Sequence, residues 1–354
     1  MPTVVVFAGA GASRSVNESQ YPTTVEFIRR LPDRILKQSA FELISEYLRS
    51  HPVAGALIDI ELLLSALQDL EAFFALLSDP ESVPGWVLRS DRLQRLAGPE
   101  VPHSSITERA PALRAAVSSL VDHINAQVFD IYSRIPEPFE LEMNWLPLLE
   151  GIVDSGYALE LFTTNYDLVI EAALTELEAR HKIPVNAIRT GRRSGLYRTL
   201  DELLWARGPS DAVPKPVGLL TKLHGSVDWS RSPSGIYVGE PNFKGHEKQV
   251  ILYPGFKGLP AAEPFASFHN YLAGAVANAD YVVFIGFAFR DKYINDILDR
   301  FTASHAKILI INPADPPLAT PFAKGRVSVL QKPFGAESAS LALNTIQFSL
   351  SGGA

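Results

Sequence analysis

Two polar side chains within Leu161–Asp167 suit chemistry on a sugar hydroxyl or a water molecule. An expected strand ends and an expected helix begins in this segment, and ligands bind at the carboxyl ends of strands in open α/β sheets. The amide of Asn165 offers both an acceptor and a donor to a ribose or a water. Asp167 either holds a hydroxyl group or caps the helix, and capping is also the alternative role for Asn165.

A histidine lies at a second expected strand end. His224 follows the apolar run Leu219–Leu223 and precedes Gly225, a residue that lets a ligand come close to the backbone. The ordinary pKa of histidine, about 6.5, suits a general base at neutral pH. A structural role is the alternative for a single histidine at this place.

A loop of small residues follows the first expected strand. The apolar run Thr3–Val6 leads into Phe7–Ser13, where backbone N–H groups can approach a phosphate closely. Arg14 stands where the dinucleotide fingerprint G-x-G-x-x-G has its third glycine, so the loop is not that fingerprint. A tight strand-to-helix turn, with glycines needed for the backbone alone, is the alternative.

Two further expected strands end in small or amide residues. Tyr281–Ile285 stops at Gly286 and leads to Arg290 and Asp291, and a later strand ends at Asn312. The carboxyl ends of parallel strands meet at one edge of a sheet, so these four strand ends predict one site. A salt bridge between Arg290 and Asp291 is the structural alternative to a nucleotide contact.

Taken together, these segments resemble the sirtuin-like NAD-binding family. More narrowly, they resemble its divergent prokaryotic branch in antiphage defence systems, the NAD hydrolase type that lacks the zinc module. The resemblance follows the family's order from residue 3 to about residue 312, and the helix expected at Asp59–Glu61 is similar to that branch as well. It is carried by Gly9–Ser13, Pro22–Thr24, Thr164–Asp167, Leu223–Ser226, Gly286–Asp291 and Ile311–Asn312.

The resemblance implies a role for each matching residue. As catalytic residues, Asn165 would order the nicotinamide ribose and the attacking water, and His224 would be the general base. Asp167 would support their pocket. Three groups would contact the rest of the dinucleotide. Those along the phosphates would be Ala10, Gly11 and Ser13. Those in the loop over the nicotinamide end would be Thr23 and Thr24. Those on the adenosine side would be Gly286, Phe287, Arg290 and Asp291, with Asn312 at a ribose hydroxyl.

The implied activity is hydrolysis of the bond between nicotinamide and ribose, with NAD as substrate, no metal, and nicotinamide and ADP-ribose as products. A constitutive enzyme of this kind would exhaust its own cell, so we expect its activity to be gated. Assembly into a homo-oligomer is one expected gate. The resemblance suggests a partner ATPase of the HerA type or an Argonaute-like protein as another.

Departures from the family pattern keep other functions open. Ala288 stands where the family often has a hydroxyl residue, and the chain has no cysteine to match the four zinc cysteines of protein-deacylating sirtuins. One alternative is a zinc-free protein deacylase or ADP-ribosyltransferase. Another is a non-catalytic module that senses NAD or ADP-ribose, and a third is a scaffold subunit with a vestigial pocket.

Bulk composition excludes several other classes. The chain has 354 residues, 47% of them apolar, and no cysteine, so disulfides, thiolate nucleophiles and iron–sulfur clusters are excluded. A net charge of −7 argues against direct binding of nucleic acid. We see no secretory signal and no apolar run near the roughly 20 residues that span a membrane. A cytoplasmic protein that does not bind membranes is therefore expected.

Apolar runs that alternate with helical patterns predict the fold. The expectation is an α/β fold with a doubly wound, Rossmann-like parallel sheet and an inserted helical subdomain. The domains would be residues 1–31 with 151–354 for the nucleotide and residues 32–150 for the insertion. Strands are expected at Thr3–Ala8, Tyr157–Thr163, Leu219–Leu223, Val250–Tyr253, Tyr281–Gly286, Lys307–Ile311 and Val327–Leu330. Helices are expected after Tyr166 and at Asp59–Leu67, Leu113–Tyr132, Pro264–Ala277, Asp291–Thr302 and Ala336–Phe348.

Overall fold

The computed structural model describes residues 2–50, 59–77, 103–181, 188–189, 198–199, 218–232, 235–238, 248–253, 264–313, 322 and 327–351. The chain divides into two compact units. The first comprises Met1–Thr23, Ile131–Leu252 and Lys257–Ala354, and the second comprises Thr24–Asp130 and Tyr253–Phe256.

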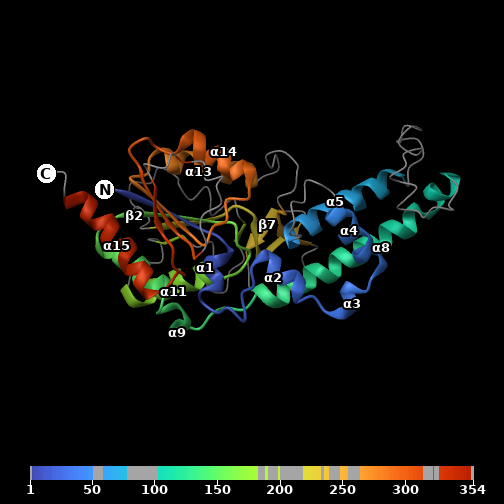
Figure 1. Ribbon diagram of the computed structural model, residues 1–354, viewed down its shortest axis with the longest axis horizontal. Coiled ribbons are helices and arrows are strands. Elements are labelled where there is room, and N and C mark those ends of the chain that lie inside the picture. The colour runs from blue at the N-terminus through green and yellow to red at the C-terminus, as the bar shows by residue number, and fades with distance from the viewer. Residues whose placement is uncertain are drawn as a thin grey trace. The chain divides into compact units, whose positions relative to one another are not determined.

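A parallel sheet forms the centre of the first unit (Figure 1). Its spatial order is β11-β10-β9-β1-β2-β5-β3, and every pair of neighbours is parallel. Without the two-residue β3, the strands follow the order 3-2-1-4-5-6 of the Rossmann fold, which reverses direction between β1 and β9. The bounds are β1 (Thr3–Ala8), β2 (Ala158–Thr163), β3 (Ile188–Arg189), β5 (Gly218–Lys222), β9 (Tyr281–Ile285), β10 (Lys307–Ile311) and β11 (Val327–Leu330).

Helices cover both faces of this sheet, as the apolar composition of its central strands requires. In Figure 1, α13 and α14 lie on one face, and α11 and α15 lie on the other. Helix α10 contacts β2, α11 and α15, and buries its apolar side from Trp145 to Ile152. The prediction of a doubly wound α/β fold is confirmed. The helices of this unit are α1 (Ala10–Arg14), α9 (Pro138–Leu141), α10 (Trp145–Asp154), α11 (Val169–His181), α13 (Phe265–Ala277), α14 (Lys292–Phe301) and α15 (Ala336–Ser351).

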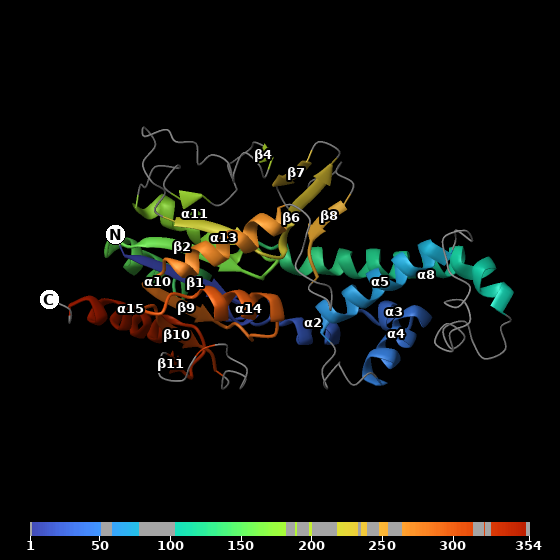
Figure 2. The ribbon, with the colours of Figure 1, turned by 90° about the horizontal axis from the view of Figure 1, so that it is seen from above.

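A second, antiparallel sheet corrects one prediction. The strand expected at Val250–Tyr253 was assigned to the parallel sheet, but it forms β8 (Lys248–Ile251) and pairs antiparallel with β6 (Gly225–Ser232). This sheet has the order β4-β7-β6-β8, with β4 (Arg198–Thr199) and β7 (Gly235–Val238), and Figure 2 shows it separate from the parallel sheet. Only two residues separate β5 from β6, so the chain passes directly from the parallel sheet into the antiparallel one.

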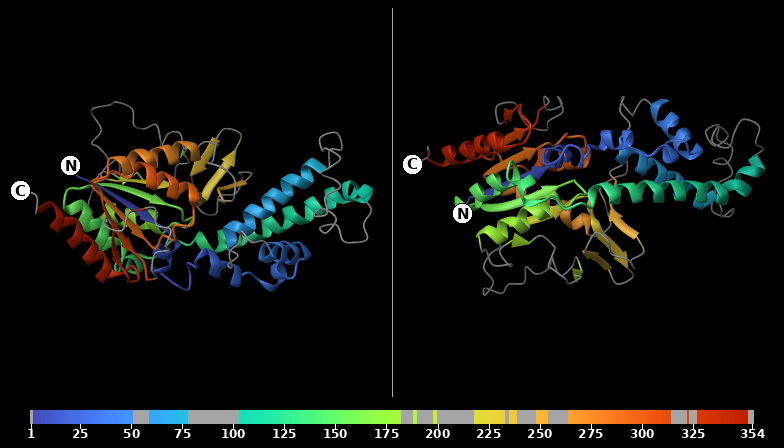
Figure 3. Two further views of the ribbon diagram at one scale, coloured as in Figure 1. Left: turned by 45° about the horizontal axis from the view of Figure 1, so that its top comes forward. Right: turned by 90° about the horizontal axis from the view of Figure 1, so that it is seen from below.

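The second unit is helical. It contains α2 (Thr24–Arg29), α3 (Asp33–Leu36), α4 (Ser39–Ser50), α5 (Ile60–Leu77) and most of α8 (His103–Tyr132). Helices α5 and α8 lie side by side in Figures 1 and 3. The helical pattern expected at Asp59–Leu67 is present, with Leu63, Leu64 and Leu67 fully buried. Among the described helices, none combines the length and the apolar character needed to cross a membrane.

The compact units have boundaries that differ from those expected from the sequence. Residues 131–150 were assigned to the insertion, but α9 contacts α11 and α10 packs on β2 and α15, all within the first unit. The proline-punctuated sequence of this segment resembles the rest of the insertion, so its packing on the sheet was not visible in the sequence. The division into a nucleotide-binding domain (residues 1–31 with 151–354) and an insertion (residues 32–150) stays a prediction.

Backbone packing between two loops explains the glycines after β1 and β9. The N–H of Gly11 donates to the carbonyl of Gly286, over 3.1 Å, and Gly286 has a φ of +56°. A Cβ on Gly286 would lie 2.4 Å from the nitrogen of Ala12 and 2.5 Å from the carbonyl carbon of Gly11. Close packing of the two backbones therefore explains why glycines occur in these loops, as the structural alternative proposed.

We expect Gly286→Ala to destabilise the first unit by at least about 2 kcal/mol. A left-handed conformation costs a non-glycine residue roughly 1–2 kcal/mol, and the clash with Ala12 adds to it. Gly274→Ala is the matched control, because an added Cβ there, in the middle of α13, has nothing within 4 Å. The control should stabilise the protein by about 0.5–1 kcal/mol. Denaturant unfolding measures both, and equal effects would contradict the packing argument.

Candidate active site

Two candidate catalytic residues occupy equivalent places on neighbouring strands. Strands β2 and β5 are parallel, and Thr163 pairs with Lys222 at their carboxyl ends. Asn165 and His224 each follow that pair by two residues. The N–H of Leu223 donates to the carbonyl of Thr163 over 2.8 Å, which continues the register past the strands. The two side chains therefore start from the same edge of the sheet, as predicted.

The amide of Asn165 is held by two hydrogen bonds. Its Nδ2 donates to the carbonyl of Gly9 over 2.9 Å and to Oγ of Ser13 over 2.8 Å. A carbonyl can only accept, so the nitrogen of the amide must face Gly9. Both amide hydrogens are used inside the protein. The oxygen Oδ1 is therefore the atom with which Asn165 can accept a hydrogen bond from a ligand or a water.

Asp167 lies behind Asn165 and caps the next helix. Its Oδ1 accepts from the N–H of Val169 over 3.0 Å, which supports the capping alternative, and its role in a ligand pocket stays a prediction. Ser13, whose Oγ accepts from Asn165, also lies near enough to the Asp167 carboxyl to lower its pKa. Burial raises the pKa of Asp167, against the opposing effects of the Lys222 ammonium and of the hydrogen bonds from Ser13 and Val169.

A buried ion pair that the sequence analysis missed lies beside Asp167. Nζ of Lys222 is 2.8 Å from Oε1 of Glu171, both side chains are 3% exposed, and Nζ also donates to the carbonyl of Asp167. Burial raises the pKa of Glu171; the ammonium of Lys222 opposes this effect, and the carboxylate of Asp228 adds to it. A lysine at the end of an apolar strand, as in Leu219–Leu223, is the sequence signal that could have identified this pair.

His224 contacts a residue that had been expected elsewhere. Its Nε2 lies 3.1 Å from Oδ2 of Asp291, and the two side chains are 2% and 9% exposed. Asp291 follows β9, which is separated from β5 by β1 and β2, so this contact joins loops from opposite parts of the sheet. The structure thus places Asp291 against the candidate base. Its expected position on the adenosine side of a nucleotide stays a prediction.

Two pKa shifts accompany this contact. Burial alone would raise the pKa of Asp291, but the hydrogen bond and charge of His224, with the N–H groups of Ile294 and Tyr293, lower it overall. Burial lowers the pKa of His269 on α13, where the Phe265 carbonyl and Asp291 oppose the effect and His224 adds to it. Asp291 is therefore ionised and His269 neutral at neutral pH.

The other residues predicted to contact the adenosine side differ in burial: some are buried and others are exposed. Phe287 is buried in an aromatic cluster, with ring centroids 4.6 Å from Phe7 and 4.9 Å from Phe289. Asn312 donates from Nδ2 to the carbonyl of Phe287 over 3.3 Å. Arg290 is exposed, as is Ala288 between the aromatic rings. Gly286 and Phe287 thus contact the glycine loop after β1 through their backbone atoms.

The loop after β1 uses several of its own N–H groups. Gly9 donates to Ile285, Gly11 to Gly286 and Ala12 to Gly9, while Ala10 is partly exposed. Ser13, expected along the phosphates, is 2% exposed and faces Asn165 instead. Of the expected nicotinamide loop, Thr23 ends the first unit and is partly exposed, and Thr24 begins α2 in the second.

Gly225 serves the protein backbone. It has a φ of +82°, and a Cβ there would lie 2.1 Å from the carbonyl oxygen of Val250. The N–H of Leu252 donates to the carbonyl of His224 over 2.8 Å. The protein backbone therefore requires glycine at this position, because β8 occupies the space of a Cβ; the close approach of a ligand stays a prediction. The same contact fixes the backbone of the candidate base.

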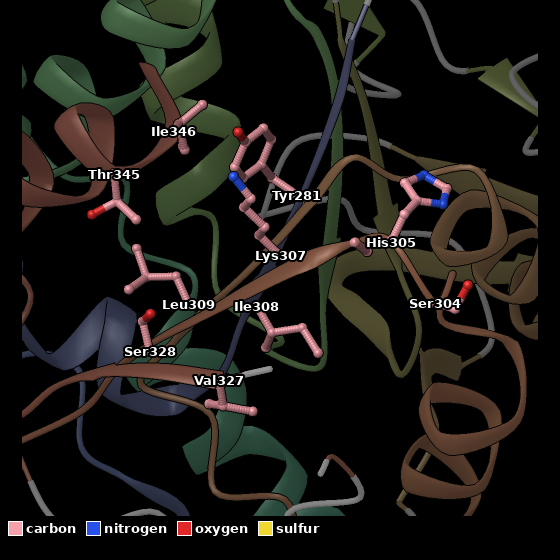
Figure 4. Close-up of a pocket in the computed structure, with 11 residues that line it drawn as sticks. Tyr281, Ser304, His305, Lys307, Ile308, Leu309, Val327, Ser328, Thr345 and Ile346 are labelled. Atoms are coloured by element: carbon pink, nitrogen blue, oxygen red, sulfur yellow. The ribbon is translucent and has the colours of Figure 1, made fainter. Parts of the chain in front are cut away.

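A cavity of about 380 Å³ lies away from these residues. Its lining comes from the amino ends of β9 and β10, from β11 and from α15, and includes Tyr281, Lys307 and Ile346 (Figure 4). It is thus at the edge of the sheet opposite to Asn165 and His224, where open α/β sheets do not bind their ligands. Within the described ranges, no group of three or more histidine, aspartate or glutamate side chains could hold a metal ion.

Part of the chain matches a known family. Residues 159–326 match the family described as SIR2-like domain, and this segment includes Asn165, His224 and Asp291. No curated protein matches the chain significantly.

Solved structures of Sir2 homologues are similar to the chain at low identity. A Sir2 homologue in complex with 2′-O-acetyl ADP ribose has 16% identity and a TM-score of 0.42, over 99% of this chain and 93% of that chain. A Sir2 homologue in complex with NAD has 14% identity and a TM-score of 0.38, over 98% and 90%. A sirtuin studied for substrate affinity has 11% identity and a TM-score of 0.41, over 97% and 93%.

The raised pKa of Asp167 makes a prediction about stability. The folded state holds a proton on Asp167 more tightly than the unfolded chain does, so its ionisation costs stability as the pH rises above 3.8, the ordinary value. Asp167→Asn keeps an oxygen for the N–H of Val169 without the charge. We expect the variant to be more stable than the parent at neutral pH, with the difference vanishing as the pH falls towards 3.8.

Thermal unfolding across this pH range measures the effect. Asp122→Asn is the control, because it makes the same substitution at an exposed position, on α8. A variant that is less stable than its parent at neutral pH would show that the protein compensates the buried charge of Asp167.

Proposed function

We propose that this chain hydrolyses NAD at the bond between nicotinamide and ribose, releasing nicotinamide and ADP-ribose. The observation that carries the proposal is the equivalent placement of Asn165 and His224, each two residues beyond the Thr163–Lys222 pair at the carboxyl ends of β2 and β5. Both lie within the segment that matches the SIR2-like domain family. The Rossmann strand order supports a dinucleotide as the ligand of this edge.

The reaction needs little from the protein beyond position and one proton acceptor. Nicotinamide leaves NAD with the electron pair of the broken C1′–N bond, and the ribose passes through a state that resembles an oxocarbenium ion. A water oxygen then bonds to C1′, and the water gives up one proton. Oδ1 of Asn165 accepts a hydrogen bond that orients this water or the ribose, and the imidazole of His224 takes the proton.

The burial of both side chains supports regulated activity. Asn165 is 7% exposed and His224 is 2% exposed, so NAD reaches them only after the atoms that cover them move apart. We propose that self-association or a partner protein favours this opening, as a conformational gate. Such control suits an antiphage effector that depletes NAD in the cytoplasm. The partner that opens the site would then be the HerA-type ATPase or the Argonaute-like protein.

Hydrolysis is favoured over deacylation by the composition of the chain. Without cysteine, this chain cannot build the four-cysteine zinc module of protein-deacylating sirtuins. A module that binds NAD or ADP-ribose without cleaving it is the second candidate, favoured by the same burial of Asn165 and His224. The two functions differ in whether a product forms.

The proposed hydrolysis makes a prediction for His224→Ala. A single placed proton acceptor contributes about 10²–10⁴-fold to a rate, so we expect nicotinamide release to fall by a factor in that range. Chromatography of NAD incubated with the pure protein measures it. His305→Ala is the matched control, because His305 is exposed at the opposite edge of the sheet.

The outcomes of this experiment separate the candidate functions. Unchanged nicotinamide release in His224→Ala would contradict the assignment of the base. If the parent protein gives no product at any concentration, with or without the partner protein, but NAD raises its unfolding temperature, the binding module replaces the hydrolase.

The gate predicts a rate that depends on assembly. If self-association opens the site, NAD consumed per protein molecule should rise with protein concentration, together with the oligomer fraction measured by light scattering. The ion pair of Lys222 and Glu171 is internal to the first unit, so salt that weakens the oligomer should leave the fold intact. Constant specific activity across the oligomer transition would exclude gating by assembly.

A further inference from the structure

The carboxylate of Asp291 has two different partners, one on each oxygen. Oδ1 accepts from the N–H groups of Tyr293 and Ile294, over 2.9 and 3.1 Å, and so caps α14. Oδ2 faces Nε2 of His224 at 3.1 Å. Because the cap fixes the plane and position of the carboxylate, the second oxygen is aimed at the imidazole and has little freedom to turn away.

The chemistry of this contact determines where the imidazole carries its proton. An ionised carboxylate can only accept hydrogen bonds, so Nε2 of His224 must be the donor. The shifted pKa of Asp291 keeps this carboxylate ionised at neutral pH. In neutral imidazole only one nitrogen bears hydrogen, and Nδ1 is then the one with a free electron pair.

The surroundings of Nδ1 agree with this role. Nδ1 of His224 is buried and has no hydrogen-bond partner among the described residues. The titratable groups that act on His224 from neighbouring elements are Asp291, before α14, and His269, on α13. His269 is neutral and donates from its Nδ1 to the Phe265 carbonyl, over 2.7 Å, so it does not compete for Asp291.

We propose that Asp291 is a positioning residue, which holds His224 in the tautomer protonated at Nε2 and thereby makes Nδ1 the basic nitrogen of the site. The reaction that Nδ1 serves rests on the proposed NAD hydrolysis, whereas the tautomer itself does not. Asp291 contacts no substrate in this scheme. It acts only through the imidazole, in the manner of the carboxylate that orients a catalytic histidine in serine proteases.

Asp291→Asn is the most informative substitution. Asparagine caps helices as well as aspartate does, so α14 keeps its cap. Its amide nitrogen, however, can donate to Nε2 and favours the opposite tautomer, with the proton on Nδ1. Asp296→Asn is the matched control, since Asp296 is exposed on the same helix.

Nitrogen NMR of the imidazole rings in the full chain, without NAD, tests the tautomer directly. His224→Ala identifies the signal of His224 by its loss. We expect the parent and Asp296→Asn to carry the proton on Nε2 and Asp291→Asn to shift it to Nδ1. A parent protonated on Nδ1, or the same tautomer in Asp291→Asn as in the parent, would overturn the proposal.

Kinetics of NAD cleavage test the consequence for the reaction. We expect Asp291→Asn to lower kcat by about 10²–10⁴-fold, as the loss of the base does, and Asp296→Asn to change it by less than about twofold. Adding Asp291→Asn to His224→Ala should lower the rate no further, because both changes remove one function. An equal further loss in the double variant would show that Asp291 acts independently of His224 and would overturn the positioning role.

The tautomer of His224 is a readout that a purely structural role of Asp291 would not move, because loss of a helix cap alone does not change which ring nitrogen carries the proton. If the parent cleaves no NAD, the proposed function fails while NMR still decides the tautomer; if the parent cleaves NAD and the tautomer is unaffected, only the role of Asp291 fails.

Discussion

The backbone contact between the loops after β1 and β9 is the constraint on which the site depends. Gly11 donates to Gly286 at the point where the strand order reverses, and neither position tolerates a side chain. From the β1 side of this contact, the carbonyl of Gly9 holds the amide of Asn165. From the β9 side, the chain continues to Asp291 and the imidazole of His224. One glycine pair therefore sets the relative positions of both candidate catalytic groups.

The elements around the site could be predicted from local sequence, because each strand is a continuous apolar run and each helix has its own boundary signal. Asp291 as the N-cap and Thr302 as the C-cap of α14 are examples. The contacts between side chains could not be predicted in the same way. Asn165 bonds to Gly9, 156 residues away, and His224 to Asp291, 67 residues away, and no local pattern encodes such pairs. The antiparallel pairing of Lys248–Ile251 was missed for a related reason: an apolar run does not show whether the strand pairs parallel or antiparallel to its neighbour.

Several charged side chains are buried beside the candidate site. Lys222 and Glu171 are paired, and Asp167 and Asp228 lie within their electrostatic reach. Burying such groups costs free energy, and breaking one partner of a buried pair costs more, roughly 3–5 kcal/mol. The ammonium of Lys222 also binds the carbonyl of Asp167 and so connects β5 to the start of α11. A lysine in an otherwise apolar strand thereby ties the segment of Asn165 to that of His224.

The double use of the Asp291 carboxylate couples the first turn of α14 to the imidazole. Fraying of this turn removes the partners of Oδ1, frees the side chain to rotate and releases the ring from its fixed orientation. Local melting of one helical turn would thus release the imidazole of His224 well before the hydrophobic core opens. Heat, mild denaturant or a protein that pulls on α14 could act in this way and be reversed without refolding the domain.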